Sequence, residues 1–226
     1  MGTVRVVDLD APGLTWVEVT MPASSGPVRL VRLHADRATG ASVSLVRFPA
    51  GWARPGTGHY TCAEEFVALD GRISVSGAGF PAGAHKYLPA LATRSDSSAG
   101  PDGCLAVAWF SGPPVWRDGA ASHSAPDRPV ASGPVLPDSV LPGSVLPGSV
   151  PPGSVPPDSV LLGSVAELPD RLPGGPADGD AGEEFAAEGF DAVFVEARTW
   201  AYVPAGEPFP DLPGPVLVRR WPRSGA

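Results

Sequence analysis

The sequence predicts an all-β fold, and three observations support this prediction. The chain has 29 prolines and 28 glycines among 226 residues, so few windows longer than about twelve residues could form a helix. Short runs rich in β-branched and aromatic residues recur at roughly the 8–12-residue interval that is typical of a sandwich or barrel. Turn signals containing Gly or Pro separate these runs. The hydrophobic fraction of 43% is sufficient to build a core.

The predicted strands lie within residues 1–120, which we expect to form one barrel domain. In chain order the runs are VRLVRLHA, ASVSLVRF, EEFVALDG, RISVSG, HKYLPAL and CLAVAWF. The segments ATG, PAG, DG, SGAG and SAGPDG lie between them and supply the turns. The whole arrangement is typical of an antiparallel sheet that connects neighbouring strands through short loops.

Residues 121–182 are predicted to form a long disordered linker. From Val135 to Ser164 a five-residue unit repeats as VLPDS, VLPGS, VLPGS, VPPGS, VPPDS and VLLGS. Such a period is too short for a solenoid of packed units, and few large apolar groups are present to offset the ordering entropy. Pro followed by Gly or Asp suits the centre of a β-turn, so each unit can form a transient turn. The alternative, a Pro-rich docking ligand, lacks the flanking charges of such ligands.

Residues 183–226 are expected to return to β structure. LTWVEV near the N-terminus is followed by GPVRLVRLHADRATG, and RTWAYV near the C-terminus is followed by GPVLVRRWPRSG. This echo leaves two alternatives open beside chance. The C-terminal segment either completes the first barrel or forms the first strands of a truncated second copy.

The charge of the chain argues against polyanionic partners. The net charge is −8 with a pI near 4.9, and Lys86 is the single lysine, so we expect neither nucleic acid nor anionic lipid to bind. No apolar run of about eighteen residues predicts a membrane span, and the N-terminus lacks an apolar signal core, which favours the cytoplasm. Cys62 and Cys104 are expected to be buried free thiols.

A stretch framed by two glycines, GWARPGTGHYTCAEEFVALDG, resembles the first motif of the cupin superfamily. That motif runs Gly, five residues, His, one residue, His, three or four residues, Glu, six residues, Gly. The frame here is Gly51, five residues, Thr57, Gly58, His59, four residues, Glu64, six residues and Gly71. Every spacing fits, but Thr57 stands in place of the first histidine. A register that makes His59 the first ligand would leave too short a gap before Glu64.

The segment GAHKYLPALATRSDSS resembles the second cupin motif. It fits as Gly83, five residues, Pro89, Ala90, Leu91, two residues and Arg94, so that Arg94 replaces the motif histidine. A rival register, FPAGAH with His85, is one residue short and leaves almost no chain for the hairpin that separates the motifs. The resemblance covers about residues 14–118, and its flanks are similar to bacterial cupins of the ChrR anti-sigma factor type.

The resemblance implies an antiparallel jelly-roll barrel with a pocket at its mouth. Many cupins bind a divalent metal through three histidines and one glutamate, but only His59 and Glu64 remain here. Arg94 would repel a dication by roughly 4 kcal/mol per unit charge at 4 Å and an effective ε of about 20. We therefore expect no bound metal and a bidentate contact between Arg94 and Glu64. If Fe, Mn, Ni or Zn does bind, the expected ligands are His59, Glu64 and His85.

Three functions remain open at this stage. The first is a metal-independent acid/base enzyme of the isomerase or lyase type, with His59, Glu64 and Arg94 as catalytic residues. The second is a non-catalytic ligand-binding or regulatory module, and the third is a metal-dependent oxygenase or hydrolase with a rebuilt ligand set. In each case the ligand is expected to be a small, anionic organic molecule, and a homodimer is conceivable. The expected pocket residues are Trp52, Thr57, Phe66, Tyr87 and Trp109.

Overall fold

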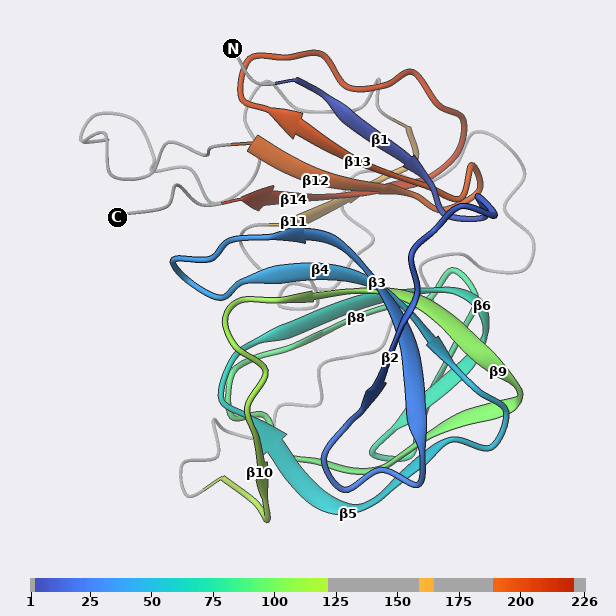
Figure 1. Ribbon diagram of the computed structural model, residues 1–226, viewed down its shortest axis with the longest axis vertical. Helices are drawn as coiled ribbons and strands as arrows, with labels where there is room; N and C mark the ends of the chain where they lie inside the picture. Colours follow the sequence, from blue (N-terminus) through green and yellow to red (C-terminus); the bar gives the residue numbers. More distant parts are fainter. Residues whose placement is uncertain (1–2, 122–158, 165–188, 222–226) are drawn as a thin grey trace. The chain divides into compact units, whose positions relative to one another are not determined.

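A computed structural model describes residues 3–121, 159–164 and 189–221 (Figure 1). These residues form strands and turns without a helix, which confirms the predicted all-β class. Accordingly, none of the described residues form a helix that is long and apolar enough to cross a membrane. The chain divides into a larger unit, residues 14–144, and a smaller unit, residues 1–13 with 145–226. Most of the predicted linker lies outside the described residues.

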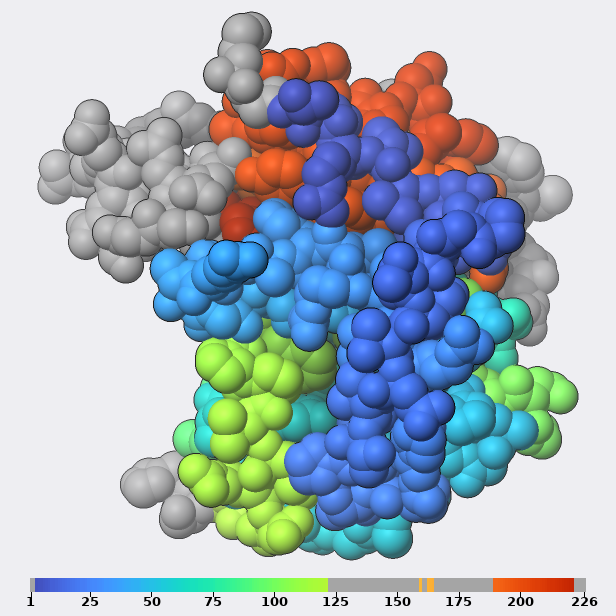
Figure 2. Space-filling model, viewed as in Figure 1, coloured from blue at the N-terminus to red at the C-terminus, as the bar shows by residue number. Residues whose placement is uncertain are grey.

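The larger unit is a curled, nine-stranded antiparallel sheet. Its strands are β2 (Val17–Thr20), β3 (Pro27–Ala35), β4 (Ser42–Phe48), β5 (Ala53–Tyr60), β6 (Glu64–Val75), β7 (Ala78–Pro81), β8 (His85–Leu88), β9 (Arg94–Phe110) and β10 (Trp116–Asp118). The main path of the sheet runs β10-β5-β9-β4-β3-β2, and β6 pairs with β7, β8 and β9. The β2–β3 hairpin lies on the surface of this unit, in blue in Figure 2.

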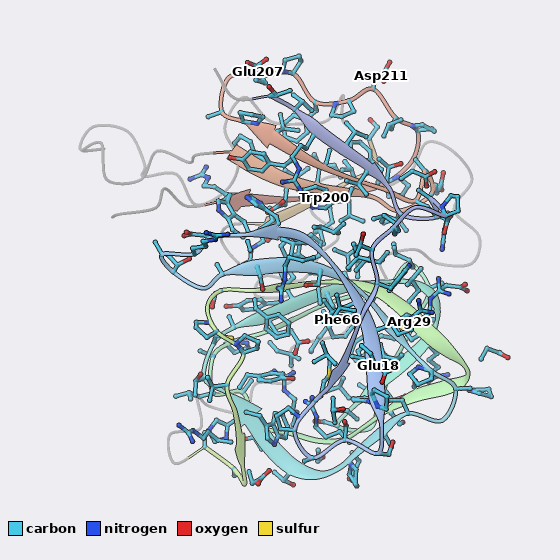
Figure 3. The ribbon with its side chains drawn as sticks, viewed as in Figure 1. Glu18, Arg29, Phe66, Trp200, Glu207 and Asp211 are labelled. Atoms are coloured by element: carbon cyan, nitrogen blue, oxygen red, sulfur yellow. The ribbon has the colours of Figure 1, made fainter. Side chains whose placement is uncertain are left out.

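The long strand β9 organises the larger unit because it pairs with three others. Its first residues pair with β5, its later residues pair with β4, and β6 pairs along much of its length. Alternate side chains of these strands therefore point into one apolar core. Phe66 lies within this core (Figure 3). Glu18 on β2 and Arg29 on β3 are strand partners in the β2–β3 hairpin. The inward set on β9 includes the small residues Ala106 and Ala108, which leave room on that side of the sheet.

The smaller unit is a five-stranded antiparallel sheet in the order β1-β13-β12-β14-β11. Its strands are β1 (Arg5–Asp8), β11 (Ser159–Leu162), β12 (Gly189–Phe194), β13 (Thr199–Pro204) and β14 (Val216–Trp221). Residues 1–13, expected in the first barrel, instead supply β1, which pairs with β13. Residues 159–162, expected in the linker, pair with β14. Within the described residues, β12, β13 and β14 pair with one another and with β1 and β11.

The sequence echo between the two ends of the chain does not correspond to matching strand pairs. β2 pairs directly with β3, whereas β13 and β14 lie on either side of β12. A better structural match is between the β12–β13 and β3–β4 hairpins. Both hairpins end in a Pro-Ala-Gly turn, with Gly51 at φ +69° and Gly206 at φ +85°. The β3–β4 and β12–β13 hairpins thus share the sequence and the glycine conformation of the turn that follows them.

Both cysteines are free and buried, as expected. Burial raises the pKa of the Cys104 thiol from its ordinary value of 9.0 to about 12. Burial also raises the pKa of Cys62. Both thiols therefore stay protonated near neutral pH and behave as small apolar side chains.

Candidate functional site

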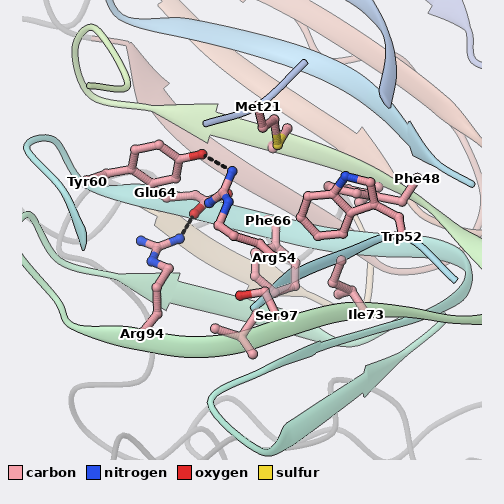
Figure 4. A pocket seen from close by; sticks show the side chains of 13 residues that line it. Met21, Phe48, Trp52, Arg54, Tyr60, Glu64, Phe66, Ile73, Arg94 and Ser97 are labelled. Carbon is pink, nitrogen blue, oxygen red and sulfur yellow. Dashed lines mark hydrogen bonds and ion pairs between the residues drawn. The ribbon is translucent and has the colours of Figure 1, made fainter. Parts of the chain in front are cut away.

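A cavity opens on the inner face of the larger unit (Figure 4). Its volume is about 50 Å³. Its walls come from β4, β5, β6 and β9, with Met21 next to β2. The lining residues are Met21, Phe48, Trp52, Arg54, Tyr60, Glu64, Phe66, Ile73, Val75, Arg94, Ser97, Ala106 and Ala108. Tyr60, Glu64 and Arg94 gather at one end of the cavity, Trp52, Phe48 and Ile73 lie at the other, and Arg54 and Ser97 lie between them (Figure 4).

Strand pairing brings the polar side chains of the cavity together. Arg54 on β5 is paired with Ser97 on β9, and Gly58 on β5 is paired with Arg94. Paired residues of an antiparallel sheet point to the same face, so Arg54 lies beside Ser97 and Arg94 lies beside Gly58. A bulge between Arg54 and Thr57 shifts the register of β5 at this point, and Asp96 on β9 has a φ of +44°. Both strands are therefore irregular where the two arginines enter the cavity wall.

Arg94 is buried, with 4% of its surface exposed, and forms an ion pair with Glu64 on β6. The contact joins Nη1 of Arg94 to Oε2 of Glu64. It is not the expected bidentate contact, because Nε and Nη2 of Arg94 have no hydrogen-bond partner. The guanidinium also stacks on the Tyr60 ring, 4.8 Å from its centroid. One carboxylate therefore balances the charge of Arg94 and leaves two of its nitrogens unsatisfied.

Arg54 is equally buried, at 4% exposure, but its hydrogen bond and its ring contacts are with neutral side chains. Its Nη2 donates a hydrogen bond to the Tyr60 hydroxyl at 2.9 Å. Its Cζ lies 4.3 Å from the Trp116 ring centroid, 5.3 Å from Tyr60 and 5.7 Å from Trp52. Its Nε has no hydrogen-bond partner. Cation–π contacts hold this guanidinium in place, but they do not neutralise its charge.

Tyr60 connects the two arginines. Its ring stacks against Arg94, and its hydroxyl oxygen accepts the hydrogen bond from Arg54. Burial raises the pKa of Tyr60, and the nearby Glu64 carboxylate adds to this effect. The phenol is therefore neutral at physiological pH, and it retains a proton that it can donate in a hydrogen bond.

His59 does not join this cluster, so the expected convergence of His59, Glu64 and Arg94 is wrong for the histidine. Its Nδ1 lies 3.0 Å from the carbonyl oxygen of Gly119. Because a carbonyl can only accept, Nδ1 carries the proton and donates it. The side chains of β5 alternate, and Tyr60 points into the cavity, so His59 points to the other face. The predicted acid/base pair of His59 and Glu64 is absent.

Three of the five expected pocket residues also lie outside the cavity wall. Trp52 and Phe66 line it, whereas Thr57 is exposed on β5. Tyr87 and Trp109 are both paired with Glu65, which faces away from the cavity because its neighbour Glu64 faces in. The sequence runs showed that these residues lie on strands, but not which face they occupy.

His85, the third residue of the alternative metal set, lies with Glu65 on this opposite face. Its Nε2 is 2.7 Å from Oε1 of Glu65, which is fully buried. His59, Glu64 and His85 thus have three different partners and do not converge. Among the described residues, no group of three His, Cys, Asp or Glu side chains is placed to hold a metal ion. The residues at the cupin motif positions therefore do not fit a metal centre.

Comparisons with known proteins support the fold. No protein-family model matches the chain, and no curated protein matches it. A candidate dioxygenase from Nostoc punctiforme PCC 73102 is structurally similar at 13% identity, covering 99% of this chain and 84% of that chain with a TM-score of 0.59. The chain therefore has the fold of that protein, and its curled antiparallel sheet is the cupin jelly roll that the motif frame predicted.

Two other solved structures are similar over a smaller part of the chain. One is a candidate acetylacetone dioxygenase from Methylibium petroleiphilum PM1, at 20% identity over 44% of this chain and 72% of that chain, with a TM-score of 0.39. The other is the anti-sigma factor ChrR, solved with SigE from Rhodobacter sphaeroides, at 19% identity over 44% and 50%, with a TM-score of 0.35.

The sequence analysis missed two residues of the site, Arg54 and Tyr60. Both lie inside the quoted motif stretch, but neither occupies a position that the cupin motif specifies. A signal was nevertheless available. Arg54 precedes Pro55 and Gly56, a pair that favours a bulge, and Tyr60 is six residues further on in the same strand.

Proposed function

We propose that this protein binds a small organic anion in the cavity of its cupin unit. The observation that supports the proposal is Arg54, a buried guanidinium in the cavity wall whose hydrogen-bond acceptor is the neutral Tyr60. Glu64, the carboxylate among the lining residues, is already paired with Arg94. A buried charge that lacks a counter-charge is costly, and an anion at Arg54 would remove that cost.

The proposal concerns binding and assigns no reaction. The acid/base mechanism expected from the sequence needed His59 beside Glu64, and the imidazole faces elsewhere. Glu64 and Tyr60 are the remaining groups of the cavity that could exchange a proton. The raised pKa of Tyr60 suits its hydroxyl to donating a hydrogen bond to a ligand, and the ion pair holds the Glu64 carboxylate against Arg94.

Replacing Arg54 with methionine is expected to weaken binding of acetate, a minimal carboxylate probe, at least about tenfold. A hydrogen bond to a charged group contributes about 1.5–3 kcal/mol, and 1.4 kcal/mol corresponds to a factor of ten. Isothermal titration calorimetry on the full chain measures the change. Arg47→Met is the matched control, because Arg47 is exposed and stacks on Trp16 away from the cavity. Equal acetate affinity in both variants would refute the proposal.

We also propose that the cupin site works without a resident metal. Protein purified without chelators is expected to contain much less than one equivalent of Fe, Mn, Ni or Zn by inductively coupled plasma mass spectrometry. The physical reason is that Arg94 stands at a motif ligand position and its positive charge repels a metal cation. Its ion pair also occupies Glu64, the motif carboxylate. A stoichiometric metal that is lost in the variant Glu64→Gln would contradict this prediction.

A further inference from the structure

We propose that the anion is a short-chain aliphatic monocarboxylate, held with its carboxylate near Arg54 and its alkyl chain toward Trp52. This inference rests on the proposed function and adds the charge, the size and the orientation of the ligand. Each of the three follows from a separate feature of the cavity.

The charge of the ligand follows from the balance of the cavity wall. Arg54 and Arg94 each contribute one positive charge, and Glu64 contributes one negative charge. The burial of both arginines limits the ability of water to screen the remaining positive charge. A monoanion restores neutrality, whereas a dianion would leave one excess negative charge next to Glu64. The wall therefore favours a single carboxylate over two.

The size of the ligand follows from the volume of the cavity. At about 50 Å³ the cavity is well below the roughly 300–1,000 Å³ of pockets that take drug-sized ligands, so it favours a ligand of only a few non-hydrogen atoms. A carboxylate with one to three further carbon atoms has about four to six non-hydrogen atoms and is comparable in size. Ala106 and Ala108 provide this space, because larger side chains at these two positions would fill it.

The orientation of the ligand follows from the separation of polar and apolar walls. Tyr60, Glu64 and Arg94 lie at one end of the cavity and Trp52 lies at the other, with the Arg54 guanidinium between them, 5.7 Å from the Trp52 ring centroid (Figure 4). Phe66 lies between these two ends. The neutral Tyr60 hydroxyl, which accepts from Arg54, has its own proton available for a carboxylate oxygen. The alkyl chain then packs against aromatic and aliphatic side chains. Because an alkyl chain has no hydrogen-bonding group, no such group of the ligand is left unsatisfied there.

Calorimetric titration of the full chain at pH 7.5 with four probes tests the three features separately. Propionate is the expected ligand, propionamide removes its charge, malonate adds a second carboxylate, and octanoate exceeds the cavity in length. Propionate is expected to bind at one per chain with a dissociation constant of about 1 mM or lower, as befits so small a ligand. The other three probes are expected to bind at least about tenfold more weakly.

The outcomes distinguish the inference from the proposed function beneath it. If malonate or octanoate binds as tightly as propionate, and Arg54→Met abolishes that binding, the site still takes an organic anion but the monocarboxylate assignment is wrong. If propionamide matches propionate, if no probe binds, or if Arg54→Met binds propionate like the wild type, both the assignment and the proposed function fail. Circular dichroism of Arg54→Met checks that this variant remains folded.

Discussion

Replacing Glu64 with alanine is expected to lower the free energy of unfolding by about 3 kcal/mol. The change leaves the buried Arg94 without its carboxylate partner, and breaking a buried ion pair on one side typically costs about 3–5 kcal/mol. Urea unfolding followed by tryptophan fluorescence measures the loss. Glu18→Ala is the matched control, since Glu18 is exposed on β2, and we expect it to change stability by about 0.5 kcal/mol or less.

An added anion is expected to restore part of the stability of Glu64→Ala. Without Glu64 the cavity has two uncompensated cations, so propionate should raise the unfolding midpoint of this variant more than that of the wild type. Two results would contradict this account of the cavity. One is a loss of stability no larger than that of Glu18→Ala, and the other is an equal effect of propionate on both proteins.

Replacing Gly71 with alanine is expected to destabilise the protein by more than about 3 kcal/mol. Gly71 has a φ of +63°, and a Cβ there would clash with the backbone carbonyl oxygen of Gly103. A left-handed backbone costs a non-glycine residue about 1–2 kcal/mol, and the clash adds to this because β6 and β9 are paired at this point. Thermal unfolding of the purified variant measures the total effect.

Gly51 provides the control for Gly71 within the same motif. It has a similar φ of +69°, but a Cβ there would meet no atom within 4 Å. Gly51→Ala is therefore expected to cost only the backbone term, about 1 kcal/mol. Equal losses of stability in Gly51→Ala and Gly71→Ala would contradict this explanation. They would show that the clash with the Gly103 carbonyl oxygen adds nothing to the cost of replacing Gly71.

The motif spacing identified two framing glycines and predicted that Glu64 and Arg94 meet. Both framing glycines, Gly51 and Gly71, adopt the positive φ that favours glycine. Glu64 and Arg94 meet although 30 positions separate them in the sequence. The spacing between motif residues reflects the lengths and pairing of the strands. The same strands can pair after the side chain at a ligand position has changed, so the spacing still predicts which residues meet.

The direction of individual side chains could not be predicted in the same way. His59 occupies a motif position, yet it points away from Glu64, because the strand alternates and Tyr60 beside it points inward. The bulge between Arg54 and Thr57 depends on pairing with β9, which is distant in the sequence. A local pattern identifies a strand, but the register of its partner decides which face each side chain occupies.

The domain organisation was obscured for a related reason. β1 and β11 are short, and each is recognisable only through its partner, β13 or β14. The sequence Ser159–Leu162 belongs to the repeat that predicts a linker, but it lies at the edge of a sheet. Pairing between distant segments gives such strands their stability, and that stability leaves little trace in local composition.

The central claim is that the cavity holds an anion beside Arg54, and a bromide soak of protein crystals tests it most directly. Bromide is a monoanion small enough for the cavity, and its anomalous scattering identifies it without reference to an organic chain. We predict a strong anomalous peak in the cavity, within contact distance of the Arg54 guanidinium. Anomalous peaks found only at exposed arginines such as Arg47, with none in the cavity, would contradict the claim.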